Sequence, residues 1–157
     1  MPTAKHGSHQ LEISASPDRV YALISDVTRI GEWSPECYQA KWLDGAAVAA
    51  VGAHFRGYNR RGPVRWQTTA VVTAARPGAE FAFSVVHGRA GREETRWRYQ
   101  LQPTSTGTLL TESFEFVWCP VGNRISELLV PRGTQVNRGI EQTLQAVKRA
   151  AESSGNS

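Results

Sequence analysis

The sequence predicts an α+β fold in which a curved antiparallel sheet of seven strands wraps around one long C-terminal helix. Three observations predict this fold. A strand and two short helices precede residue 36, only strands and turns follow as far as residue 118, and a helical pattern occupies residues 133–152. Strands and helices do not alternate along the chain, which excludes a Rossmann or TIM-barrel arrangement.

The chain has the size of one domain, with 157 residues, of which 40% are hydrophobic and 20% charged. We predict a single domain over residues 9–152, with flexible tails at 1–8 and 153–157. No apolar run approaches the roughly 20 residues of a membrane span. The polar N-terminal segment lacks the apolar stretch of a signal peptide, so we expect a cytoplasmic protein. The sequence does not specify an oligomeric state.

The N-terminal region predicts one strand and two short helices. Apolar and polar residues alternate over residues 10–15, which is typical of a half-buried strand. Ser16-Pro17-Asp18 then predicts a helix start, because serine accepts a free backbone N–H, proline suits the first helical position and aspartate complements the positive helix end. Asp26 is the expected cap of a second short helix that ends at Ile30.

Six further strands are predicted between residues 37 and 118. Each break between them contains Gly or Pro, which supply the backbone angles of tight turns or end strand pairing. Connections this short join antiparallel neighbours. The predicted strands are residues 37–43, 53–60, 64–75, 79–87, 94–102 and 107–118.

The C-terminal part is predicted to be helical. A short segment over residues 123–130 ends at Pro131, and a longer helix follows over residues 133–152. Gly139 and Thr143 are small and lie beside its apolar stripe, where they permit either close packing against a strand or room for a bound molecule. The stripe consists of Val136, Ile140, Leu144, Val147 and Ala151.

The apolar face of the sheet and the apolar stripe of the helix can each be buried only against the other. A strongly twisted sheet touches one helix along a line and leaves a gap beside it. The two short helices would close one end of that gap. The arrangement therefore predicts an internal, mostly apolar cavity of the kind that holds a small molecule.

Three stretches resemble a known superfamily. Residues 13–27 read ISASPDRVYALISDV and residues 30–35 read IGEWSP, a combination that resembles the opening of the START-like (SRPBCC) proteins. Residues 52–66, GAHFRGYNRRGPVRW, resemble the polyketide cyclase/dehydrase and lipid-transport branch. The resemblance covers residues 9–151 and implies a helix-grip fold whose cavity binds lipids, polyketides, steroids or hormones. It supplies no catalytic residue, because no catalytic motif of the family matches.

Aromatic side chains on the predicted inward faces of the strands are the main candidates for a ligand site. The residue pattern assigns most of them to an ordinary core, and Trp33, near the short helices, is the best candidate for a pocket wall. The predicted ligand-binding residues are Trp33, Phe55, Asn59, Trp66, Phe83, Trp97, Tyr99, Glu112, Phe114, Gly139 and Thr143.

Glu112 is also the one candidate for a catalytic acid or base. It lies on the predicted inward face of its strand, between Leu110 and Phe114, and a buried carboxylate must be paired, hydrogen-bonded or protonated. One interpretation is that a nearby Arg or Trp satisfies it, or that a register slip places it on the other face. The alternative is a polar anchor or an acid/base group inside the cavity.

Other reactive residue types form no recognisable site. The four histidines do not cluster with carboxylates at metal-ligand spacing, so no metal is expected. No phosphate-binding or nucleophile motif implies a cofactor. His54 and His87 are either strand-end residues or proton shuttles, and His9, near the tail, needs no role. Cys37 and Cys119 are expected to be reduced, mostly buried thiols.

Three functions fit the sequence. The first is binding of a small hydrophobic or amphipathic molecule, lipid or polyketide-like, in the cavity. The second is a polyketide cyclase or dehydratase that uses cavity acids and bases for aldol closure or water loss. The third is interaction with a macromolecule through the basic hairpin at residues 56–65. The net charge of +4 is too small to require nucleic acid, which is not the expected partner.

Overall fold

The computed structural model describes residues 6–118 and 132–153, of which residues 132–137 are described by their backbone. These elements confirm the α+β class and the predicted order of a strand, two short helices, six strands and a C-terminal helix. In chain order they are β1 (His6–Ile13), α1 (Pro17–Ile24), η1 (Val27–Glu32), β2 (Cys37–Trp42), β3 (His54–Arg61), β4 (Val64–Arg76), β5 (Glu80–His87), β6 (Arg92–Pro103), β7 (Thr108–Phe116) and α3 (Arg132–Ser153).

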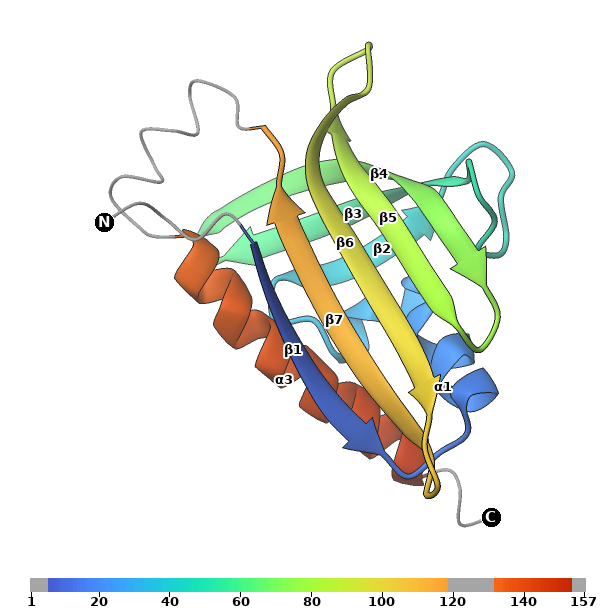
Figure 1. Ribbon diagram of the computed structural model, residues 1–157. Coiled ribbons are helices and arrows are strands. Elements are labelled where there is room, and N and C mark those ends of the chain that lie inside the picture. Colours follow the sequence, from blue (N-terminus) through green and yellow to red (C-terminus); the bar gives the residue numbers. More distant parts are fainter. Residues whose placement is uncertain (1–5, 119–131, 154–157) are drawn as a thin grey trace.

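The seven strands form one sheet in the order β1-β7-β6-β5-β4-β3-β2. Every neighbouring pair is antiparallel, as the short connections predicted. Figure 1 shows the sheet curving around α3, which lies along β1 and β7, while α1 lies near one end of the sheet. This is the helix-grip arrangement, and it gives the sheet a concave face directed at α3.

The first strand begins earlier than the alternation of residues predicted. It starts at His6, not at residue 10, and residues 6–8, expected in a flexible tail, pair with residues 113–115 of β7. A short stretch with Gly7 at its centre carries little side-chain pattern. The pairing partner offered by β7 therefore decides the strand, since β-propensity depends more on neighbours than on local sequence.

The predicted caps of the two short helices are confirmed. The Ser16 hydroxyl accepts the backbone N–H of Arg19 at 3.2 Å, and the Asp26 carboxylate accepts the N–H of Thr28 at 3.1 Å. The second helix is of the tighter 3-10 type and continues to Glu32, beyond its predicted end. These caps fix where the chain turns to close one end of the sheet.

Part of the C-terminal prediction falls outside the described residues. This applies to the short helix at 123–130, to Cys119 and Pro131, and to the side chain of Val136. The rest of the predicted stripe on α3 is buried, as expected. It consists of Ile140, Leu144, Val147 and Ala151.

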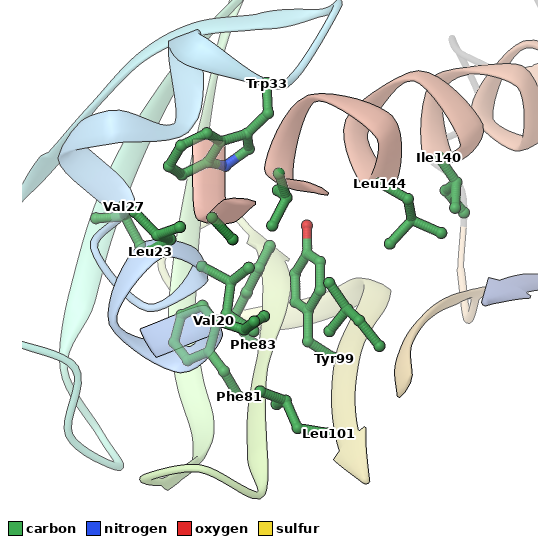
Figure 2. Close-up of a cluster of buried hydrophobic side chains, with 14 of the residues drawn as sticks. Val20, Leu23, Val27, Trp33, Phe81, Phe83, Tyr99, Leu101, Ile140 and Leu144 are labelled. Carbon is green, nitrogen blue, oxygen red and sulfur yellow. The ribbon is translucent and has the colours of Figure 1, made fainter. Parts of the chain in front are cut away.

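The core fills the concave side of the sheet near α1. Figure 2 shows side chains from α1, from strands β5 and β6 and from α3 pointing toward one another in this region. Phe81, Leu110 and Ile140 are at most 1% exposed there. None of the helices in the described part of the chain is long and apolar enough to cross a membrane.

Candidate functional site

A continuous row of aromatic rings crosses the concave face of the sheet. Consecutive ring centroids lie between 5.0 Å and 6.4 Å apart, within the range at which aromatic pairs attract. Four of the six rings were predicted as ligand-binding residues. We call this row the aromatic ladder, and it consists of Trp42, Phe55, Phe83, Trp97, Phe114 and Phe116.

Small side chains on β4 allow the ladder to pass from β3 to β5. Phe55 lies directly opposite Ala70 of β4, and the neighbouring inward residue of β4, Val72, lies opposite Phe83 of β5. Because Ala70 and Val72 leave room above the strand, the Phe55 and Phe83 rings meet edge to face at 5.0 Å across it. This contact requires a small residue on β4 and not merely an apolar one.

Three rings of the ladder are buried and three are partly exposed. Phe55 and Phe114 are each 3% exposed, whereas Trp42, Trp97 and Phe116 are half-buried. Trp66, also predicted for the site, is half-buried, lies opposite Asn59 on the same face and has the Arg61 guanidinium 5.7 Å from its ring centroid. The concave face thus combines a packed region with a region of accessible rings.

Glu112 points inward, as predicted, and is 3% exposed. The Tyr99 hydroxyl, from the adjacent strand β6, donates a hydrogen bond to its Oε1 atom at 2.8 Å. Figure 2 shows the Tyr99 side chain directing its hydroxyl away from β6 and toward α3. The second carboxyl oxygen, Oε2, is buried and has no hydrogen-bond partner among the described residues. The hydrogen-bond partner of the Glu112 carboxyl is therefore a tyrosine and not the Arg or Trp that the sequence suggested.

Burial sets the protonation state of this pair. Loss of water raises the pKa of Glu112 to about 8, and the Tyr99 hydrogen bond only partly opposes that effect. The pKa of Tyr99 is raised well above its ordinary value, first by burial and then by the neighbouring carboxyl. At neutral pH the site therefore presents a protonated carboxyl and a protonated phenol.

Two further polar side chains flank the site on β2 and β3. The Asn59 amide is 7% exposed and donates to the Thr68 hydroxyl at 3.3 Å. Cys37 pairs with Asn59 across the strands and is free, as predicted, although only half-buried. Burial raises the pKa of its thiol, and the thiol lies close enough to Tyr99 to contribute to the raised pKa of that phenol. These groups add polar character without a fixed charge.

The two small residues on α3 have different surroundings. A side chain added at Gly139 would lie 3.4 Å from the Pro35 ring, so the neighbour is the segment after η1 and not a strand. The Thr143 hydroxyl is buried and donates to the carbonyl of Gly139 at 2.8 Å. Its polar atom is thus satisfied within the helix itself.

A groove of about 740 Å³ runs beside α3, bounded by β1, the segment after η1 and α3 itself. Trp33 and Leu144 contribute its buried apolar walls, and Trp33 is the one predicted ligand-binding residue that lines it. Its other α3 residues include the exposed side chains of Glu141, Gln145 and Arg149. The groove is therefore an open, half-polar surface feature and differs from the enclosed apolar cavity predicted beneath Trp33.

His9 has structural surroundings that the sequence did not predict. It lies half-buried in β1 directly opposite Glu112 of β7, and its Nδ1 atom is 3.5 Å from Oε1 of Glu141 on α3. Ile13, at the end of β1, is buried, and every second residue before it lies on the same inward side: Leu11, His9 and Gly7. Extending the predicted alternation backward from Ile13 would therefore have placed His9 on the inward face.

The remaining candidates from sequence lie apart from the ladder. The His87 imidazole is exposed and 3.1 Å from the Glu94 carboxylate, and His54 is half-buried at the start of β3. In the basic hairpin, Arg60 stacks over the Tyr38 ring at 5.4 Å. Within residues 6–118 and 132–153, no three His, Cys, Asp or Glu side chains gather as metal ligands.

A family model and one solved structure show the family of this chain. The family model described as polyketide cyclase / dehydrase and lipid transport matches residues 6–152. The Polyketide_cyc-like protein Cgl2372 from Corynebacterium glutamicum is 34% identical, with a TM-score of 0.67, over 99% of this chain and 96% of that protein. No protein with a curated description matches.

Two more distant structures share the fold. The di-domain ARO/CYC StfQ, from the steffimycin biosynthetic pathway, is 13% identical with a TM-score of 0.75, and the match covers 99% of this chain and 53% of StfQ. Protein CV1439 from Chromobacterium violaceum is 18% identical with a TM-score of 0.68, over 95% of this chain and 99% of that one.

Proposed function

This chain belongs to the polyketide cyclase / dehydrase and lipid transport family, and on that premise we propose that it binds a small hydrophobic or amphipathic molecule, lipid-like or polyketide-like. The proposed site is the concave face of the sheet beneath α3. The aromatic ladder would contact the apolar body of the ligand, together with Trp66, and the Glu112–Tyr99 pair would contact its polar part.

One observation carries the proposal: inward-facing rings of the concave face remain partly exposed. Here Trp42, Trp66 and Trp97 face the concave side and are only half-buried. Covering such rings with an apolar molecule gains roughly 25 cal/mol for each Å² removed from water, which favours a ligand at this position.

The relatives favour the same class of ligand. Cgl2372 is described as Polyketide_cyc-like, and StfQ is described as an ARO/CYC protein of the steffimycin biosynthetic pathway. StfQ shares only the fold with this chain, so it supports the shape of the site and not an identical ligand. A flat, partly polar molecule of polyketide type would match rings flanked by one buried acid.

We expect the trihydroxyanthraquinone emodin or the neutral lipid 1-monoolein to raise the melting temperature of the purified protein. A ligand that binds the folded state at about 100 times its Kd stabilises it by about 2.7 kcal/mol, or roughly 5–10 °C for a chain of this length. Thermal denaturation monitored by circular dichroism measures the shift. Native mass spectrometry of freshly purified protein would detect a co-purified ligand.

Two matched tryptophan variants locate the binding. Trp97→Leu changes a half-buried ring of the ladder, whereas Trp118→Leu changes a half-buried ring outside it, beside His87 and Arg92. Trp97→Leu should abolish most of the ligand-induced shift and Trp118→Leu should keep it. Absence of any shift in the parent protein with both compounds, and a native mass equal to the bare chain, would contradict the proposed function.

The Glu112–Tyr99 pair also favours a second candidate, a cyclase or dehydratase. A carboxyl that holds its proton at neutral pH can donate it to a carbonyl oxygen during aldol closure or to a departing hydroxyl during water loss. The geometry supplies such an acid within an aromatic surface, which is suited to a folded poly-β-keto chain.

Turnover separates the enzyme from a binding protein. A synthetic linear tetraketide thioester, incubated with the protein, should give a cyclised or dehydrated product detectable by mass spectrometry above the uncatalysed rate. Glu112→Gln removes the transferable proton and should lower that rate at least 100-fold while leaving emodin binding in place. A rate unchanged by Glu112→Gln would remove Glu112 from the mechanism.

A further inference from the structure

We propose that Glu112 is the point of polar recognition in this site and that it selects a neutral ligand presenting a carbonyl or hydroxyl oxygen beside an apolar ring. This inference rests on the proposed binding function and narrows the class of ligand. It makes a specific distinction: a neutral oxygen acceptor should bind, whereas a carboxylate of the same shape should be rejected.

The unpaired oxygen of Glu112 is the first ground for the proposal. Tyr99 occupies Oε1 at 2.8 Å, while Oε2 is buried and lacks a hydrogen-bond partner in the part of the chain that the structure describes. Buried polar atoms are nearly always hydrogen-bonded, and one left without a partner is destabilising. An oxygen atom of a ligand that accepts from Oε2 would complete the set of hydrogen bonds at this carboxyl.

The position of Glu112 beside the aromatic ladder is the second ground. Phe114, a ring of the ladder, follows Glu112 by two residues on the same face of β7. Alternate residues of a strand are about 7 Å apart, close to the length of two fused aromatic rings. A ligand whose ring system lies against Trp97 and Phe114 can therefore place an attached oxygen at Glu112.

The charges around Glu112 are the third ground. Tyr99 faces it from β6 and His9 from β1, and His9 lies 3.5 Å from Glu141 of α3. Cys37 of β2 is close enough to influence Tyr99. No Arg or Lys has a hydrogen bond or ion pair with Glu112 in the described part of the chain.

Without a cationic partner, the buried carboxyl keeps its proton at neutral pH, with a pKa of about 8. A protonated carboxyl donates to a neutral oxygen, as the proposal requires. A ligand carboxylate would have to lose its own water without a cation to pair with, which is strongly unfavourable. Because Oε2 is buried, the side chains that cover it must move when a ligand binds. The polar group of the bound ligand then lies out of contact with water.

Four naphthalene probes of similar shape test the selection. They are 2-acetonaphthalene, which carries a ketone, 2-ethylnaphthalene, which lacks it, 2-naphthoate, which is anionic, and 2-naphthylmethylammonium, which is cationic. Isothermal titration of the full-length protein at about pH 6.5 should show the ketone binding about tenfold more tightly than 2-ethylnaphthalene and at least tenfold more tightly than 2-naphthoate. The ketone preference should decline at about pH 9, where Glu112 loses its proton.

Two substitutions assign the effect to Glu112. Glu112→Met keeps the length of the side chain without a donor and should bring the ketone and 2-ethylnaphthalene within about twofold of each other. Glu112→Gln keeps an N–H donor that does not titrate and should retain a ketone preference at both pH values. Circular dichroism and the affinity for 2-ethylnaphthalene, unchanged within about twofold, verify that each variant is folded and keeps its apolar site.

The outcomes distinguish this inference from the proposed function. If the ketone and 2-ethylnaphthalene bind the parent protein equally, or if the anionic or cationic probe binds most tightly, selection of a neutral oxygen by Glu112 is wrong and apolar binding stands. If none of the four probes binds, the proposed binding function itself is contradicted. A ketone preference that survives in a folded Glu112→Met variant would assign recognition to another residue.

Discussion

Glu112→Gln is expected to raise the melting temperature at pH 8 by several degrees and to flatten the dependence of stability on pH between about 4.5 and 8. The cause is the carboxyl itself: its pKa is about 8 in the folded protein, against an ordinary value of 4.5. Below pH 4.5 both the folded and the unfolded chain hold this proton, so ionisation of Glu112 has no effect on the free energy of unfolding.

The sign follows from the raised pKa. As the pH rises from 4.5 toward 8, the unfolded chain releases the proton of Glu112 while the folded chain retains it. Ionisation then favours the unfolded state by roughly 1.4 kcal/mol per pH unit. The loss of stability is complete above pH 8, where both states are ionised. Glutamine does not titrate, and its amide can still accept the hydrogen bond of Tyr99.

Thermal unfolding of the parent protein and of the variant at pH 5, 6, 7 and 8 measures this difference. Glu115→Gln is the matched control, because Glu115 lies on the same strand, is exposed and pairs with Arg96 at 3.5 Å. Exposed pairs contribute about 0–1 kcal/mol, so the control should be neutral or slightly less stable. Parallel curves for Glu112→Gln and the parent protein would show that the carboxyl is ionised in the folded state.

The fold could be predicted from sequence because its signals are local. Each predicted break between strands contains Gly or Pro, and alternation assigned the inward face of β7 correctly, including Glu112 and Phe114. Helical spacing found the buried stripe on α3. Turn chemistry and periodicity act over a few residues, so one sequence is enough to recognise them.

The contacts of the site depend on pairings between distant residues. The Tyr99–Glu112 bond requires one particular register of β6 against β7. That register depends on the geometry of the turn between them as well as on the side-chain pattern. The meeting of Phe55 with Phe83 depends on Ala70 being small in a strand between them. Sequence placed the rings on one face, while their order across the sheet came only from the structure.

The sequence predicted an enclosed apolar cavity near Trp33, but the structure has an open groove with polar side chains there. Trp33 does line a groove, but exposed polar side chains of α3, among them Glu141 and Arg149, line it too. Helical spacing identifies the buried stripe of α3 and not which flanking residues face a neighbouring segment. The approach of Gly139 to Pro35 is one such contact, and it joins residues more than 100 positions apart in the sequence.

Phe83→Ala is expected to lower the free energy of unfolding by about 3–5 kcal/mol, the range for truncating a buried phenylalanine. The Phe83 ring is 8% exposed and contacts three other rings, those of Phe55, Phe81 and Trp97. Its removal leaves a cavity where the ladder crosses β5, and the stiff strands on either side cannot close it. The expected fall in melting temperature is roughly 6–20 °C.

Phe116→Ala is the matched control, because the same atoms are removed at the end of the ladder. Phe116 is half-buried and its ring contacts that of Phe114, so we expect a loss of about 1–2 kcal/mol. Urea denaturation at constant m-value measures both free energies. A loss at Phe116 equal to that at Phe83 would mean that the end of the ladder is as tightly packed as its centre, and the accessible rings on which ligand binding depends would then belong to the core.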